Sequence, residues 1–127
     1  MRDSLSETRV LLVDDNTLNL LLIRKLLGKW GAIVETAENG QIAVDLAQQH
    51  HDANTPYEVI IMDLQMPVMD GFTACQTIRQ FDKSVIILAA SASALSADEI
   101  ISNGFSDCLV KPFDANQLQE KLRTSLV

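Results

Sequence analysis

The chain has 127 residues, of which 47% are hydrophobic and 21% are charged, and it carries a net charge of −7. This length suits one domain with its own core, and the acidic balance disfavours direct contact with nucleic acid or anionic lipid. No apolar run approaches the roughly 20 residues that a membrane span requires. The polar start, residues 1–8, lacks the apolar segment of a signal peptide, so we expect a cytoplasmic protein without membrane contact.

Short apolar runs rich in β-branched residues alternate with amphipathic segments along the whole chain. The predicted elements, in chain order, are a strand over 9–13, a helix over 17–29, a strand over 33–36, a helix over 41–49, a strand over 59–62, a helix over 71–80, a strand over 84–90, a short helix over 97–103, a strand over 107–110 and a helix after 114. This alternation predicts a five-stranded parallel sheet with helices on both faces, joined by right-handed crossovers. We therefore expect one α/β domain over 9–127, preceded by a loose lead-in over 1–8.

The predicted helices carry start signals and apolar rows. Asn16 is a suitable N-cap for the first helix, and Ser96 with Glu99 forms a capping box before the fourth. The first and last helices repeat leucine at every fourth position, which predicts that each is amphipathic with its leucine row on the core side. These rows are Leu18, Leu22 and Leu26, and Leu118, Leu122 and Leu126. The adjacent His50 and His51 point apart on a helix and are expected to form a solvated helix end.

Charged residues directly follow three of the predicted strands. Asp14 and Asp15 follow the first strand, Asp63 follows the third, and Lys111, with Pro112, follows the fifth. The carboxyl ends of parallel strands share one rim, where ligands bind, so we expect these side chains to converge on one pocket. Clustered carboxylates repel one another unless a hard cation joins them, and Mg2+ prefers such oxygen ligands. The pattern predicts phosphate chemistry on a carboxylate, with the lysine supplying the positive charge that a phosphoryl group needs.

Asp63 is the leading candidate for a covalent acceptor, because a carboxylate can attack phosphorus and form an aspartyl phosphate. Lys111 precedes a proline, and a turn there could aim its ammonium over the pocket. Ser91 ends the fourth predicted strand, where its hydroxyl could hydrogen-bond a phosphoryl oxygen. An ordinary loop serine among Ser91, Ser93 and Ser96 is an equally good interpretation of that residue.

Four stretches surround these candidate residues. They are VLLVDDN (10–16), VIIMDLQMPVMDG (59–71), LAASASA (88–94) and LVKPF (109–113). In this order and spacing they resemble the receiver, or response-regulator, domain of two-component signalling, and the resemblance extends from about Thr8 to Val127. Two segments, MDLQMPVMDG and VDDNTLN, most resemble the receiver domains attached to hybrid sensor histidine kinases.

The resemblance implies a flavodoxin-like, doubly wound fold and a Mg2+ site. Asp14 and Asp15 match the acidic pair that binds the metal in this family. Asp15, Asp63 and the backbone carbonyl of Gln65 would be direct ligands. Asp14 would act mainly through water.

The resemblance also implies a chemistry and a partner. Asp63 matches the phosphoacceptor, Ser91 matches the hydroxyl residue that senses the phosphoryl group, and Lys111 matches the lysine that forms an ion pair with it. The family's donor is a phosphohistidine on a histidine kinase or on a histidine phosphotransfer protein. Phosphorylation in the family draws the hydroxyl residue inward and remodels the face formed by the fourth helix, the fifth strand and the fifth helix.

Cys108 departs from the family pattern, which usually carries Tyr or Phe three residues before the lysine. A cysteine cannot fill the volume of an aromatic ring that changes rotamer together with the hydroxyl residue. Two hypotheses follow: the output depends on backbone and loop movement alone, or the domain relays phosphate without a strong conformational readout. We expect both cysteines, Cys75 and Cys108, to be reduced thiols in the core.

The predicted function is a phosphoaccepting switch or relay that catalyses only its own phosphorylation and hydrolysis, and so is not an enzyme with an external substrate. One alternative is a free-standing aspartyl-phosphate hydrolase. That chemistry favours a second acid two residues after the nucleophile, where Gln65 stands. Another alternative is a degenerate interaction module that is never phosphorylated, which the complete set of acids, serine and lysine opposes.

Overall fold

The computed structural model describes residues 5–126, which fold into five parallel strands and five helices. The strands are β1 (Arg9–Val13), β2 (Ile33–Ala37), β3 (Val59–Asp63), β4 (Ile86–Ser91) and β5 (Asp107–Val110). The helices are α1 (Thr17–Lys29), α2 (Gly40–Asp52), α3 (Gly71–Arg79), α4 (Ala97–Asn103) and α5 (Ala115–Ser125). The strands form one sheet in the order β2-β1-β3-β4-β5, which confirms the predicted α/β class. Among the described residues, no helix has both the length and the apolar character needed to cross a membrane.

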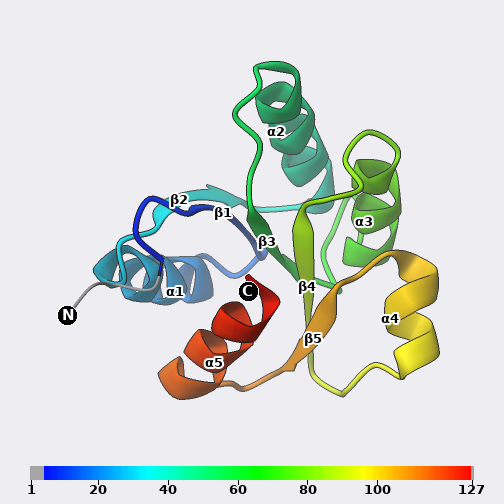
Figure 1. Ribbon diagram of the computed structural model, residues 1–127. Helices are drawn as coiled ribbons and strands as arrows, with labels where there is room; N and C mark the ends of the chain where they lie inside the picture. Colours follow the sequence, from blue (N-terminus) through cyan, green and yellow to red (C-terminus); the bar gives the residue numbers. More distant parts are fainter. Residues whose placement is uncertain (1–4, 127) are drawn as a thin grey trace.

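The helices form a layer on each face of the sheet (Figure 1). Helices α1 and α5 lie on one face, and α2, α3 and α4 lie on the other. Successive side chains of a strand point to opposite faces, so each central strand contributes to both layers. In β1, Val10 and Leu12 pack beneath α1 and α5, whereas Leu11 and Val13 pack beneath α2 and α3. This double burial explains why the central strands are continuous apolar runs.

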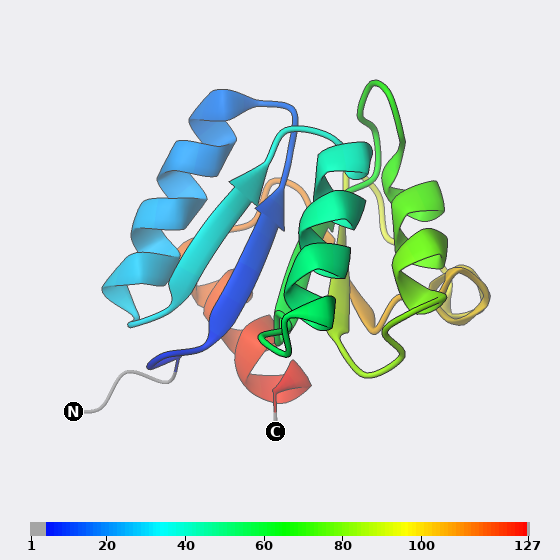
Figure 2. The same cartoon turned by 90° about the horizontal axis from the view of Figure 1, so that it is seen from above.

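The strand order reverses direction at β1. From β1 the chain first adds β2 on one side, and then crosses to add β3, β4 and β5 on the other. The carboxyl ends of β1 and β3 therefore border a topological switch point, where open α/β sheets bind ligands. Figure 2 shows strands pointing toward one end of the molecule, with the loop before α3 projecting beyond them.

The predicted helix starts agree with the structure. The side chain of Asn16 caps α1 at 3.1 Å from a first-turn N–H, and Ser96 and Glu99 form the capping box of α4. These bonds satisfy backbone donors that have no partner inside the helix. The leucine row of α5 packs into the core as predicted, at Leu118, Leu122 and Leu126.

Of the leucine row predicted for α1, only Leu26 packs against the core, where it is partly buried. Leu18 and Leu22 are 61% and 57% exposed. The helix instead buries Leu20 and Leu27, and Ile23 is partly buried between them. These three residues follow i, i+3, i+7 spacing and share one face of the helix. The prediction is wrong for Leu18 and Leu22, because this helix carries leucines on both faces and their spacing alone could not identify the buried face.

The amino-terminal lead-in is anchored where the structure describes it. Residues 1–4 lie outside the described part of the chain, but Leu5 is 1% exposed and Thr8 is also buried. Leu5 packs into the cluster beneath α1 and α5, and the backbone N–H of Glu7 donates to the carbonyl of Gly31 at 2.9 Å. The prediction of a loose lead-in is therefore wrong for this described segment, because one buried leucine holds it against the domain.

The fourth strand begins two residues later than predicted, at Ile86. The carboxylate of Asp82 accepts hydrogen bonds from the backbone N–H groups of Ser84 and Val85, at 3.0 and 3.1 Å. These bonds hold a turn that competes with the sheet for the same backbone donors. The ladder therefore starts only after the turn is complete.

We expect Leu27→Ala to lower the free energy of unfolding by about 2–5 kcal/mol, because it leaves a cavity in the core. Leu22→Ala removes the same atoms from an exposed position of the same helix, so a change within about 0.5 kcal/mol is expected. Urea denaturation followed by far-ultraviolet circular dichroism measures both values. Equal losses in the two variants would contradict the face that the structure assigns to α1.

Candidate functional site

Three carboxylates meet at the carboxyl end of the sheet. Asp14 follows β1 directly, Asp15 comes next, and Asp63 is the last residue of β3. One oxygen from each lies within 4.8 Å of the others. Asp14 and Asp63 are 4% and 8% exposed, whereas Asp15 is exposed to solvent. The structure therefore brings the three acids together, and their oxygen atoms suit a hard divalent cation such as Mg2+.

Lys111 reaches the buried acids from the end of β5. Its Nζ lies 3.4 Å from Oδ2 of Asp14 and 3.2 Å from Oδ1 of Asp63. Its backbone N–H donates to the carbonyl of Ser91 at 2.7 Å, which fixes the strand end that carries the side chain. The Lys111–Pro112 peptide bond is cis. The ammonium thus offsets part of the repulsion between two carboxylates.

Burial raises the pKa of Asp63 above its ordinary value, because low-dielectric surroundings disfavour the charged form. The hydrogen bond and positive charge of Lys111 oppose this rise, whereas the nearby Asp14 carboxylate adds to it. The backbone N–H of Gln65, 3.5 Å from Oδ1, also favours the ionised form. The ionised form of Asp63 is therefore less stable in the folded protein than it would be in water. Shifted pKa values of this kind are common among reactive groups.

Ser91 is the last residue of β4 and borders the same cavity as Asp63. The cavity has a volume of about 380 Å³, and Gln65 and Lys111 also line it. The hydroxyl oxygen of Ser91 accepts a hydrogen bond from the backbone N–H of Ser93 at 3.3 Å. Ser91 therefore lies at the cavity of Asp63, as predicted from its position, while its hydroxyl takes part in a local turn.

Close approach of α3 to the end of β3 requires a glycine at position 71. A Cβ atom at Gly71 would lie 2.3 Å from the carbonyl oxygen of Asp63. The backbone N–H of Gly71 donates to the carbonyl of Leu64 at 3.0 Å. The loop after Asp63 is thus closed tightly against α3, which fixes the position of the acid.

The two cysteines differ in their surroundings. Cys75 of α3 is fully buried, and burial raises the pKa of its thiol to about 11, in agreement with a core thiol. Cys108 of β5 is only partly buried, and it lines a surface cavity together with Phe113 and Lys121. The core prediction is wrong for Cys108, because β5 has no neighbouring strand on its outer side in the described sheet.

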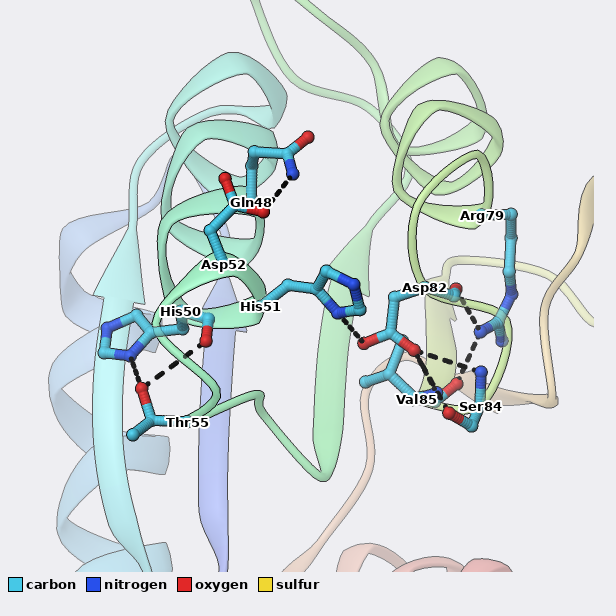
Figure 3. Close-up of polar contacts among 9 residues, drawn as sticks. All are labelled: Gln48, His50, His51, Asp52, Thr55, Arg79, Asp82, Ser84 and Val85. Atoms are coloured by element: carbon cyan, nitrogen blue, oxygen red, sulfur yellow. Dashed lines mark hydrogen bonds and ion pairs between the residues drawn. The ribbon is translucent and has the colours of Figure 1, made fainter.

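The adjacent histidines of α2 point in different directions and do not share a site (Figure 3). His50 Nε2 lies 2.9 Å from Oε1 of Glu35, and its Nδ1 lies 3.0 Å from the hydroxyl of Thr55. His51 points toward Asp82, with a longer separation of 3.8 Å. The prediction of a solvated helix end is wrong for His50, which two polar neighbours hold. Both histidines lie at the end of α2 away from the acids, because α2 begins at the carboxyl end of β2.

The sequence pattern does not reveal one set of polar contacts at the site. The side-chain amide of Asn19 donates to Oδ2 of Asp14 at 3.5 Å, and the backbone N–H of Asn16 donates to Oδ1 at 2.9 Å. These donors orient the Asp14 carboxylate from the first turn of α1. In the sequence, this contact is indicated only by an asparagine five residues after the acid that ends a strand. That spacing is too common to identify the contact.

Comparison with known proteins agrees with this geometry. The family model named response regulator receiver domain matches residues 10–123 of this chain. The chain belongs to this family. Receiver domains act in two-component signalling, and this one is 37% identical over 119 residues to the sensor histidine kinase GacS of Pseudomonas protegens. The match covers 88% of this chain and 12% of that kinase, so the receiver domain corresponds to one segment of a much longer relative.

Solved structures share the fold of this receiver domain. One of them is the receiver domain of sensor histidine kinase PA1611 from Pseudomonas aeruginosa, solved with a magnesium ion coordinated in its active site cleft. It matches with a TM-score of 0.83 and 33% identity, over 95% of this chain and 98% of that one. A co-crystal structure contains the Saccharomyces cerevisiae histidine phosphotransfer protein Ypd1 and the receiver domain of its downstream response regulator Ssk1. It matches with a TM-score of 0.80 and 31% identity, over 92% of this chain and 87% of that one.

We expect the stability difference between the wild type and Asp63→Asn to depend on pH in metal-free buffer. The pKa of Asp63 in the folded protein lies above its ordinary value of 3.8. Between these two pKa values the folded protein therefore binds more protons than the unfolded chain does. The wild type should therefore lose stability relative to the variant as the pH rises through that window. Urea unfolding at a series of pH values, with a chelator present, measures the difference. A constant difference between about pH 3 and about pH 7 would contradict the raised pKa.

Proposed function

We propose that the domain accepts a phosphoryl group on Asp63 from a phosphohistidine of a histidine kinase or of a histidine phosphotransfer protein. The observation that supports this is a buried carboxylate cluster in which Lys111 contacts both Asp14 and Asp63. In the transfer step, a carboxylate oxygen of Asp63 attacks phosphorus, and the P–O bond forms as the P–N bond breaks. The phosphohistidine ring is protonated on its other nitrogen, so the imidazole leaves with the electron pair of the P–N bond as a neutral ring that keeps this proton. The products are an aspartyl phosphate and a neutral histidine.

Lys111 and Ser91 would contact the oxygens of the transferred group. The ammonium of Lys111 is already at the acceptor, so it can offset the charge that the phosphoryl group adds. Water later attacks the phosphorus of the aspartyl phosphate, releases inorganic phosphate and restores the Asp63 carboxylate. The domain thus turns over no external substrate, and this chemistry is that of a switch or relay rather than of an enzyme.

Asp14, Asp15 and Asp63 are the residues that would hold Mg2+, with the backbone carbonyl of Gln65 as a further ligand. Their carboxylate oxygens lie within 4.8 Å of one another, in keeping with an ion that takes oxygen ligands. When bound, the ion supplies positive charge that offsets the charges of the acceptor and of the phosphoryl group. The buried Asp14 is oriented by its own amide donors, so the ligand set is organised before the ion binds.

The exposed leucines of α1 would form part of the docking surface for the donor protein. Leu18, Leu21 and Leu22 are 61%, 50% and 57% exposed, in the helix that follows Asp14 and Asp15. Apolar side chains gathered beside a polar pocket are typical of a protein interface. The receiver domain of Ssk1, which is similar to this chain, was crystallised with a phosphotransfer protein, and this supports a donor of that class.

Helix α4 is the element best suited to move when the acceptor is phosphorylated. Within α4, all of which the structure describes, no residue is buried. Its carboxyl end is held by Arg79, whose Nε donates to the carbonyl of Gly104 at 2.8 Å, whereas its amino end follows the Ser91 loop. A Ser91 drawn toward a phosphoryl group would therefore shift the amino end of α4. With Cys108 in place of an aromatic ring, this supports a readout through loop and backbone movement.

We further propose a hybrid sensor histidine kinase as the parent protein, with residues 9–127 as its receiver unit in the cytoplasm. The two segments that resemble hybrid kinases and the similarity to GacS support this origin. The negative net charge fits a unit that meets other proteins rather than nucleic acid.

Intact-mass measurement after incubation with acetyl phosphate and Mg2+ tests the acceptor. The wild type is expected to gain one phosphoryl group, and Asp63→Ala is expected to gain none because it lacks the acceptor oxygens. Chelation of the metal should abolish the gain in the wild type, since the charges of donor and acceptor then repel. Asp45→Ala, which removes an exposed acid on α2, should behave as the wild type does. A folded wild type that gains no mass from any phosphodonor would overturn the proposal.

The docking surface is tested by comparing a protein donor with a small one. Leu18→Ala and Leu21→Ala are each expected to slow transfer from phosphorylated Ypd1 by about tenfold, equal to about 1.4 kcal/mol, and to leave the acetyl phosphate rate unchanged. Ile101→Ala is the matched control, because Ile101 is 75% exposed on α4. Equal slowing with both donors would indicate damage to the pocket rather than to a docking surface.

A further inference from the structure

Val68 lies in a strained backbone conformation close to the acceptor in the sequence. Its φ is +71°, a region that β-branched residues rarely adopt. The N–H of Met69 donates to the carbonyl of Pro67 at 2.8 Å, so Val68 is the central residue of a γ-turn of the rare, strained kind. Glu7 and Asn54 also have positive φ, but neither of them is β-branched.

Flanking contacts fix this turn on both sides. The carbonyl of Met69 accepts a hydrogen bond from the N–H of Gly40 at 3.2 Å, and a Cβ atom at Gly40 would lie 2.4 Å from that oxygen. Next along the chain, Asp70 caps α3 by accepting from the N–H of Thr73 at 2.8 Å. The backbone around residue 68 is therefore held by its neighbours, and the central residue takes the conformation that closes the turn.

The side chain of Val68 contributes little to the folded core. The residue is 81% exposed, the highest value among the large hydrophobic residues of the described chain. A glycine would take the same turn without a Cβ atom in a disfavoured position. Valine thus lowers stability here without burying apolar area in this chain, which points to a contact with another molecule.

The position of the turn indicates which molecule the side chain of Val68 contacts. Val68 lies five residues after Asp63, in the loop that projects beyond the carboxyl ends of the strands (Figure 2). Asp63 is only 8% exposed, so a donor must approach along this rim and cover the loops around it. Two further exposed apolar residues, Leu18 and Ile42, lie in the first turns of α1 and α2 at the same end. Apolar side chains therefore flank the acids on several sides.

We propose that Val68 is a specificity-determining contact for the protein phosphodonor, held outward by its strained turn so that its isopropyl group meets an apolar patch beside the donor's phosphohistidine. The inference rests on the proposed function and describes the surface that delivers the phosphoryl group. A side chain fixed in advance loses less entropy on docking than one carried by a flexible loop. A small donor such as phosphoramidate reaches Asp63 without this contact.

The test compares transfer from phosphorylated Ypd1 with transfer from phosphoramidate. Val68→Gly and Val68→Ala are expected to slow transfer from Ypd1 by at least about fivefold and to leave the phosphoramidate rate unchanged. Val68→Ile keeps a branched apolar side chain and should retain the wild-type rate with both donors. Val68→Gly should also raise the midpoint of thermal unfolding by a few degrees, because it removes the Cβ atom from a positive-φ position. Ile101→Ala is the matched control for loss of an exposed apolar group.

Two outcomes would overturn the inference. One is a normal rate from Ypd1 in Val68→Gly, and the other is a wild type that accepts phosphate from phosphoramidate but not from Ypd1. A lower unfolding midpoint in Val68→Gly would contradict the strain on which the argument depends. A wild type that accepts phosphate from neither donor would instead refute the proposed function, so the two failures are distinguishable.

Discussion

The balance between three carboxylates and one ammonium is the interaction on which the rest of the site depends. Asp14, Asp15 and Asp63 each place an oxygen within 4.8 Å of the others, and such a group is stable only where positive charge offsets its repulsion. Lys111 supplies part of that charge and contacts two of the acids. The sheet order brings these strand ends together, and the tight closure of the loop before α3 and the first turn of α1 hold the acids in place.

Several features around this cluster favour function at the expense of stability. Burial raises the pKa of Asp63, so the ionised acceptor is costly to maintain. Leu18 and Leu22 remain exposed on α1, and Val68 closes a strained turn with its side chain in solvent. Strain and exposed apolar area are common at sites that bind and react, where the rest of the structure compensates. Here the compensation comes from central strands that are buried on both faces.

Helix α4, which follows the Ser91 loop, is packed lightly, and this suits a readout by movement. No residue of α4 is buried among the residues that the structure describes, and Arg79 holds this helix at its carboxyl end. Cys108, at the outer edge of the sheet, is too small to act as the aromatic ring that usually accompanies the hydroxyl residue in this family. Both features agree with the proposed readout through loop and helix movement rather than through a change of side-chain rotamer.

The sequence by itself determined the strand and helix alternation, the helix caps and the acids at the strand ends, because these depend on local periodicity and on short-range hydrogen bonds. Tertiary structure alone decided which face of α1 is buried, since leucines occupy both faces. It also decided that Lys111 meets Asp14, which lies 97 residues earlier, because that contact requires the sheet order. The contact of His50 with Glu35 and the bond from the N–H of Gly40 to the carbonyl of Met69, beside the turn at Val68, likewise join separate segments, so no local pattern encodes them.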